Sequence, residues 1–264
     1  MSDPAGQRLQ KALAHLGLAS RREVEAWIRA GRLTVNGQAA TLGMRVLASD
    51  KVRLDGRLVR QRAPSTGRVF AVHRSPGAAL RELMSQLPRS GGRRLVAVSP
   101  MPEIDGGLEV LSSDGATAER LQRGVRHLSV DFSVRVHGEL SPQGIEQVLQ
   151  GRLDNGTTLR VQGCEAAGGE GSNRWYSVVA IGASGKDIRQ LFERQGALVS
   201  RVLRTRLGTV TLERSLARGR SRVLDEAQTA ALLAALAAPA QAGEAQAGES
   251  ETGAAATGPR SVRR

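Results

Sequence analysis

The chain has one cysteine, Cys164, among its 264 residues. A single cysteine excludes an internal disulfide and any metal site built from several cysteines, so we expect Cys164 to be a buried, unreactive thiol. No uncharged apolar run reaches the ~18 residues that a membrane helix needs, and the opening residues MSDPAGQRLQ lack the apolar stretch of a signal peptide. We therefore expect a cytoplasmic protein with no membrane partner.

The common catalytic motifs are also missing. The four histidines, at positions 15, 73, 127 and 137, show neither HExxH nor any comparable metal spacing, and no GxSxG or P-loop pattern occurs. The glycine-rich residues 168–173, GGEGSN, precede a predicted strand and not a helix, which indicates a hairpin connection and not a phosphate loop. We therefore expect no metal site.

Positive charge is abundant and unevenly placed. The formal net charge is +13, but 35 of the 38 basic residues are arginine, a bias that codon usage alone can produce. The position of the charge is more informative, because residues 1–62 hold 12 basic and 5 acidic side chains. Such a dense positive field at one end of the chain is typical of a protein that binds a polyanion.

The first 62 residues predict two helices followed by hairpins. Apolar residues recur at helical spacing from Leu9 to Leu16, and Gly17 is suited to end that helix. Ser20 with Glu23 forms a capping-box pattern for a second helix that ends at Gly31. The dipeptides Asn36-Gly37 and Asp55-Gly56 predict tight turns between short strands. Val24, Trp27 and Ile28 form the apolar stripe of the second helix, and we assign Trp27 to the core.

The run RLQKALAHLGLASRREVEAWIRAGRLTVNG resembles the S4-type RNA-binding domain first described in a ribosomal protein. An independent argument agrees, because Arg21 and Arg22 stand in the first turn of a helix, where the macrodipole disfavours cations by ~0.3 to 1 kcal/mol each. A phosphate partner explains that placement better than stability does. The predicted RNA-binding residues are Arg8, Lys11, Arg21, Arg22, Arg32 and Lys51, and Arg29 either extends this surface or is simply solvated.

Beyond a polar linker at residues 60–67, strand patterns alternate with helix patterns. Residues 116–124, 141–151 and 186–196 predict helices, and residues 130–140, 173–182 and 202–212 predict strands. The mixture indicates an α+β fold with a largely antiparallel sheet. We predict an S4-type domain at 1–62, a second domain at 63–224, and a C-terminal helix with a disordered tail at 225–264.

Residues 95–115, LVAVSPMPEIDGGLEVLSSDG, predict a strand, a proline-containing loop and a second strand. This stretch resembles the core of the bacterial ribosomal pseudouridine synthases that carry an N-terminal S4-type domain. The resemblance, which extends over about residues 7–224, implies a cofactor-free rearrangement of uridine by an aspartate, on structured ribosomal RNA. Aligned without gaps, Pro102 stands in the place of that aspartate, and the literal GRLD at 151–154 lies far downstream in a predicted turn.

The remaining family positions are partly retained. Asp105, three residues after Pro102, is the nearest substitute acid. Arg189 matches the basic residue that sits by the family's aspartate, and Phe132 replaces a tyrosine that stacks on the target base. The basic loop before Ile188 is reduced to GASGKD, and the segment before residue 95 is shorter than the family usually has.

The sequence therefore favours an RNA-binding protein, of ribosomal RNA, built on a pseudouridine synthase fold with a degenerate active site. We expect it to be a monomer without a cofactor. One alternative is an active uridine isomerase that uses Asp105, and another is an interaction scaffold in ribosome assembly.

Overall fold

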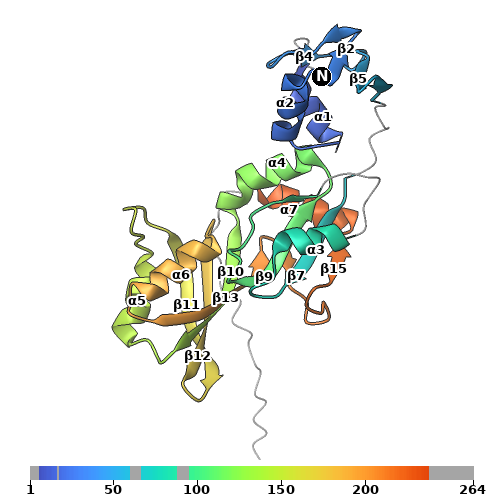
Figure 1. Ribbon diagram of the computed structural model, residues 1–264. Coiled ribbons are helices and arrows are strands. Elements are labelled where there is room, and N and C mark those ends of the chain that lie inside the picture. The colour runs from blue at the N-terminus through green and yellow to red at the C-terminus, as the bar shows by residue number, and fades with distance from the viewer. Residues whose placement is uncertain (1–5, 17, 60–66, 88–94, 238–264) are drawn as a thin grey trace, which may run out of the picture.

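A computed structural model describes residues 6–16, 18–59, 67–87 and 95–237. Figure 1 shows a small N-terminal domain above a larger domain, with helix α4 (Gly115–Gly124) between them. Among the described residues, no helix is both long and apolar enough to cross a membrane. Residues 60–66 of the predicted linker, the helix stop at Gly17 and the tail beyond Ala237 lie outside the described residues.

The N-terminal domain is a helix pair packed on short strands. The capping box at Ser20 and Glu23 is present, and Gly31 follows α2 with a φ of 68°, as the sequence predicts. Asn36 and Gly37 adopt φ values of 51° and 88°, the left-handed conformation that a tight hairpin needs. The elements are β1 (Gln7–Arg8), α1 (Leu9–His15), α2 (Arg21–Arg29), β2 (Leu33–Val35), β3 (Gln38–Ala39), β4 (Arg45–Val46), β5 (Val52–Leu54) and β6 (Arg57–Leu58).

This domain has its own core. Leu9, Leu13, Val24 and Leu33 are each at most 1% exposed and belong to one apolar cluster. Trp27 packs against that cluster, which agrees with its assignment to the core. Because the two helices bury their stripes against each other and against β2, their charged residues are left on the outside.

The larger domain is built on one mixed sheet of strand order β11-β12-β10-β13-β9-β7-β15, with β14 and β8 attached at its sides. Only β13 and β9 pair in parallel among the described strands, so the predicted antiparallel sheet is confirmed. The strands are β7 (Val69–Arg74), β8 (Val96–Ala97), β9 (Gly106–Ser112), β10 (Ser129–His137), β11 (Arg160–Glu170), β12 (Asn173–Ile181), β13 (Leu198–Leu207), β14 (Val210–Thr211) and β15 (Ser221–Val223).

Helices cover this sheet in two groups. Helices α5 (Pro142–Gln150) and α6 (Gly185–Glu193) lie against the β11–β13 part, where the Phe192 ring meets the Tyr176 ring edge-on at 5.7 Å between centroids. Helix α7 (Glu226–Ala235) places Leu236, just beyond its end, against Gly124 of α4. The remaining helices are α3 (Leu80–Gln86) and the short η1 (Val125–His127). The cap at Ser141 and the three helices predicted near residues 115, 141 and 186 are confirmed.

Several elements escaped the sequence analysis. Helix α3 and strand β15 have no strong periodicity, and β11 ends in a stretch rich in Gly and Ala. Residues 168–173 form the end of β11, a two-residue turn and the start of β12, a hairpin as expected, and Cys164 is buried. Burial raises the pKa of the Cys164 thiol to about 11, so the thiol stays protonated at neutral pH.

Candidate functional site

Asp105 and Arg189 form a largely buried ion pair at the start of β9. Arg189, on α6, donates from Nη2 to Oδ1 of Asp105 at 2.5 Å and from Nε to Oδ2 at 3.3 Å. The backbone N–H of Val202 donates to the same Oδ1 at 2.9 Å. Asp105 is 0% exposed and the Arg189 side chain is 15% exposed. Burial alone would lower the pKa of Arg189, but its bonds to the Asp105 carboxylate raise it above the ordinary value.

The loop before Asp105 is held by a buried cluster of two arginines and one glutamate. Arg74 donates from Nε to Glu109 Oε1 at 2.8 Å, and Arg204 donates from Nη2 to Glu109 Oε2 at 3.0 Å. All three side chains are 1% exposed. Burial lowers the pKa of Arg204, although the Glu109 charge opposes that effect. The cluster satisfies the condition that buried charges need paired, hydrogen-bonded partners.

The same cluster shapes the loop backbone around Pro102. Arg74 donates from Nη2 to the carbonyl oxygens of Met101 and Pro102 at 2.9 and 2.8 Å. Arg204 donates from Nη1 to the carbonyl oxygen of Ser99 at 2.7 Å. The Asp105 N–H then donates to the Pro102 carbonyl at 3.0 Å, and this turn directs the Asp105 carboxylate toward α6. Pro102 thus contributes its backbone carbonyl to this loop, and Arg189 takes Asp105 as its partner.

Sequence reasoning missed this cluster. A signal was present, because Glu109 interrupts the apolar run of β9 while Arg74 and Arg204 interrupt or end the runs of β7 and β13. Charges inside strands that are buried on both faces require partners of opposite sign. Which strands become neighbours was not readable from the local pattern.

Phe132 lies in the hydrophobic core. Its side chain is 1% exposed and belongs to the main apolar cluster, so in this arrangement neither face of the ring is open to a base. Base stacking by Phe132 stays a prediction without support from the structure. The GRLD string at 151–154 forms a turn after α5, with Gly151 at a φ of 67°, as the sequence indicates. Among the described residues no group of three or more His, Cys, Asp or Glu side chains is arranged to hold a metal ion.

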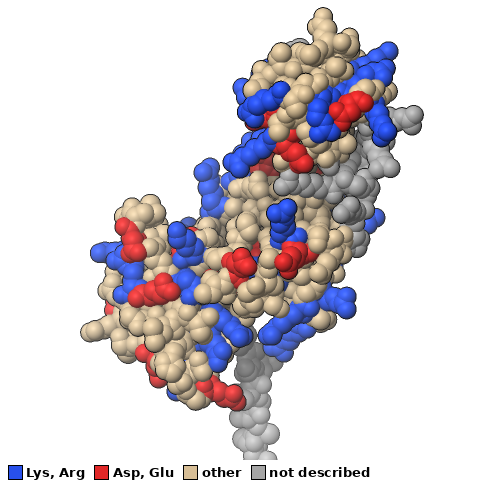
Figure 2. Space-filling view, viewed as in Figure 1, with Lys and Arg blue, Asp and Glu red and all other residues tan. Residues whose placement is uncertain are grey.

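Some of the predicted RNA-binding residues are exposed without an ion pair to a described residue, and others are paired with carboxylates. Arg8, Arg22 and Lys51 are exposed on the N-terminal domain, and Figure 2 shows basic side chains on several sides of it. Arg32, in contrast, donates to both oxygens of Asp55 at 2.9 and 2.5 Å, and its guanidinium lies 5.7 Å from the Trp27 ring centroid. A phosphate would have to compete with that carboxylate for Arg32.

Lys11 and Arg21 reach across to the larger domain. Both approach Glu119 of α4, with Lys11 Nζ at 3.7 Å and Arg21 Nη2 at 3.5 Å from its carboxylate. Arg123, on the same helix as Glu119, lies 3.3 Å away. One carboxylate therefore faces three cations at the contact between the domains.

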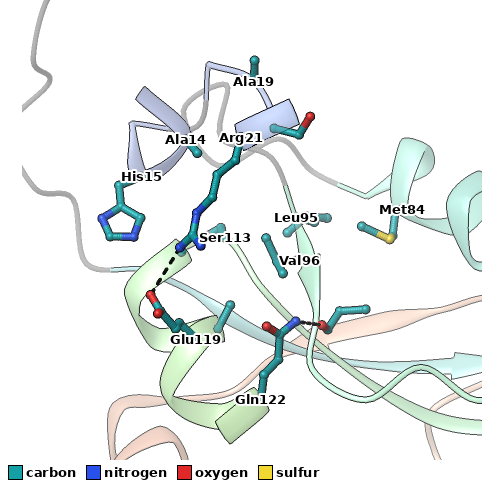
Figure 3. Close-up of a pocket in the computed structure, with 14 residues that line it drawn as sticks. Ala14, His15, Ala19, Arg21, Met84, Leu95, Val96, Ser113, Glu119 and Gln122 are labelled. Atoms are coloured by element: carbon teal, nitrogen blue, oxygen red, sulfur yellow. Dashed lines mark hydrogen bonds and ion pairs between the residues drawn. The ribbon is translucent and has the colours of Figure 1, made fainter. Parts of the chain in front are cut away.

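A cavity of about 570 Å³ lies beside this contact. Figure 3 shows the Arg21 side chain extending from α2 to Glu119, with His15 on one side and Leu95 and Val96 on the other. The His15 Nε2 atom is buried without a hydrogen-bond partner, and burial, with the charge of Lys11, lowers the pKa of that ring. The interface is thus incompletely packed and its polar groups are incompletely satisfied.

One family model and several known proteins match this chain. Residues 7–52 match the family described as S4 domain. The chain is 37% identical over 234 residues to ribosomal large subunit pseudouridine synthase B of Pseudomonas aeruginosa, covering 84% of this chain and 61% of that protein. It is 35% identical over 236 residues to the Salmonella typhi protein of the same name, covering 84% of this chain and 81% of the relative.

The chain belongs to the ribosomal large subunit pseudouridine synthase B family. A solved structure named pseudouridylate synthase has the same fold, with a TM-score of 0.56 at 17% identity over 86% of this chain and 100% of that one. The α+β prediction and the resemblance described above are therefore confirmed.

Proposed function

We propose that this chain binds ribosomal RNA through its S4 domain without isomerising uridine. The binding part is supported by the domain match, by the 12 basic against 5 acidic residues in positions 1–62, and by exposed Arg22 in the first turn of α2. A cation in that position opposes the helix macrodipole, so a phosphate partner is the physical reason for it.

One observation carries the proposed lack of catalysis. The Asp105 carboxylate is 0% exposed, and both of its oxygens accept hydrogen bonds from Arg189 or Val202. A carboxylate that acts on a flipped-out nucleotide has to reach the sugar of that nucleotide. The Pro102 side chain has no functional group that can replace such a carboxylate. Deleting a covalent nucleophile can lower the rate by up to roughly 10^6.

Binding is tested with the whole chain and a labelled fragment of large-subunit ribosomal RNA. Affinity is expected to fall as salt rises, with a log–log slope of about 0.7 to 0.9 per neutralised phosphate. Replacing Arg22 with Ala is expected to weaken binding and flatten the slope by about one contact. A shallow slope, with partner proteins retained at high salt, would instead indicate the assembly-scaffold function.

Catalysis is tested by tritium release from uracil-labelled ribosomal RNA. We expect no release by the wild-type chain, nor by Pro102→Asp, because a carboxylate at 102 would lack the basic loop that is GASGKD here. Positioning is what makes a bound nucleotide reactive, so one restored group is not expected to suffice.

A second candidate function has a specific observation in its favour. Arg189, the residue aligned with the family's basic partner of the aspartate, pairs with Asp105. If the pair opened around RNA, Asp105 would be a relocated catalytic acid. Tritium release by the wild type that is lost in Asp105→Asn, with an unchanged circular-dichroism spectrum and thermal midpoint, would establish that function and refute the proposal.

A further inference from the structure

The β10–β13 part of the sheet has a face, opposite α6, on which the side chains are half-buried or exposed. Side chains alternate along β10, and Val130, Phe132, Val134 and Val136 are buried. On the neighbouring strand β12, Tyr176 contacts Phe192 of α6, so Tyr176 points to the helix-covered face. Because successive residues of a strand point to opposite faces, Trp175 points away from α6.

Strand register places Trp175 in a row with two arginines. Arg135 of β10 is paired with Trp175 of β12 on one side and with Arg201 of β13 on the other. The Arg135 guanidinium lies 6.0 Å from the centroid of the Trp175 ring. One step along the strands, His137 is paired with Leu198, which is 68% exposed. We call Trp175, Arg135 and Arg201 the Trp175 row.

The charge of this row is not neutralised within the described part of the chain. Arg201 is exposed, and neither Arg201 nor Arg135 forms an ion pair with a described residue. Arg204 and Arg206, further along β13, do form such pairs, with Glu109 and Asp131. This end of the sheet thus combines a half-buried aromatic ring with one half-buried and one exposed arginine, neither of which has a counter-charge among the described residues.

We propose that the Trp175 row binds unpaired nucleotides of single-stranded RNA. A base can stack on the Trp175 ring or on the planar Arg135 guanidinium, while Arg201 contacts the adjacent phosphate. These side chains favour RNA over a protein partner, because the aromatic ring matches a base and the arginines match the phosphates. The row goes beyond the S4 domain site proposed above and is chemically different from it.

The two sites are also apart in space. Strand β10 begins at Ser129, after α4 and η1, and reaches Arg135 six residues later, roughly 20 Å along the strand. One RNA that contacts both would gain affinity through the linkage of two weak sites. The row is therefore expected to bind short single strands weakly by itself and to strengthen the binding of a longer RNA.

Tryptophan fluorescence separates the two sites, because the chain has only two tryptophans, Trp27 and Trp175. Trp27→Phe leaves Trp175 as the single reporter, and Trp175→Phe leaves Trp27 in the S4 domain. The probe is oligouridylate, titrated into the whole chain, with a duplex RNA for comparison. We expect saturable quenching by oligouridylate in the Trp27→Phe chain and little quenching in the Trp175→Phe chain.

Arg201→Ala, made in the Trp27→Phe chain, is expected to weaken that quenching at least about fivefold in affinity. The matched control is Arg152→Ala, which removes an exposed arginine after α5. Absence of saturable quenching, or equal losses for the two substitutions, would overturn the proposal. In the Arg22→Ala chain, oligouridylate should quench Trp175 normally while the ribosomal fragment binds weakly. A failure of the Trp175 row is therefore distinguishable from a failure of the proposed S4 site.

Discussion

Glu119 is expected to compete with RNA for the S4 domain. Its carboxylate lies 3.7 Å from Lys11 and 3.5 Å from Arg21, two of the predicted phosphate contacts. The side chains of Lys11, Arg21 and Glu119 are 38, 53 and 31% exposed, so each pair is solvated. Exposed pairs are worth about 0.2–1 kcal/mol each, which puts the two interdomain pairs together at no more than about 2 kcal/mol.

Replacing Glu119 with Gln removes that competition while keeping the size of the side chain. Because an RNA phosphate would no longer have to displace a carboxylate, affinity for the ribosomal RNA fragment is expected to rise by about three- to tenfold at low salt, the upper end corresponding to ~1.4 kcal/mol. The gain should shrink at high salt, since screening weakens both the lost ion pairs and the RNA contacts. Fluorescence anisotropy of labelled RNA at several salt concentrations measures both effects.

The matched control is Glu25→Gln, which removes one negative charge from the S4 domain at an intrahelical pair with Arg29. Equal gains for Glu119→Gln and Glu25→Gln would refute the reasoning, because net charge alone would then explain both. A double-mutant cycle sharpens the test: Arg21→Ala should cost more affinity in the Glu119→Gln background than in the wild type.

Three further predictions concern stability and the thiol. Glu109→Gln leaves two buried arginines without a counter-charge and is expected to cost about 3–5 kcal/mol in urea unfolding, whereas Glu213→Gln, at a partly exposed pair, should cost under about 1. Gly107→Ala is expected to lower the thermal midpoint more than Gly156→Ala: both have positive φ, but at Gly107 the new Cβ would stand 2.3 Å from a backbone oxygen, and at Gly156 it meets nothing within 4 Å. Cys164 should stay unmodified by a thiol reagent at pH 8 until the protein unfolds. Because burial raises the pKa of the folded thiol from 9.0 to about 11, the thiol does not reduce the free energy of unfolding below about pH 9, and that free energy falls as the pH rises from there toward 11.

Sequence alone determined many of the local elements of this protein. The capping box at Ser20, the turn at Asn36-Gly37 and the alternation along β10 were readable because each depends on residues a few positions apart. The α+β class followed from such signals, and the S4-type domain was predicted from the resemblance of one continuous run of residues. The sequence also led to the prediction that Pro102 stands in the place of the family's aspartate, and that alignment stays a prediction.

Tertiary structure decided what those residues contact. Asp105 and Arg189 are 84 positions apart, and the sequence named both without predicting that they pair. The Arg74–Glu109–Arg204 cluster and the Trp175 row depend on which strands become neighbours and in which register. Register and strand order arise from the burial of whole faces, a cooperative property of the folded chain that no short segment encodes.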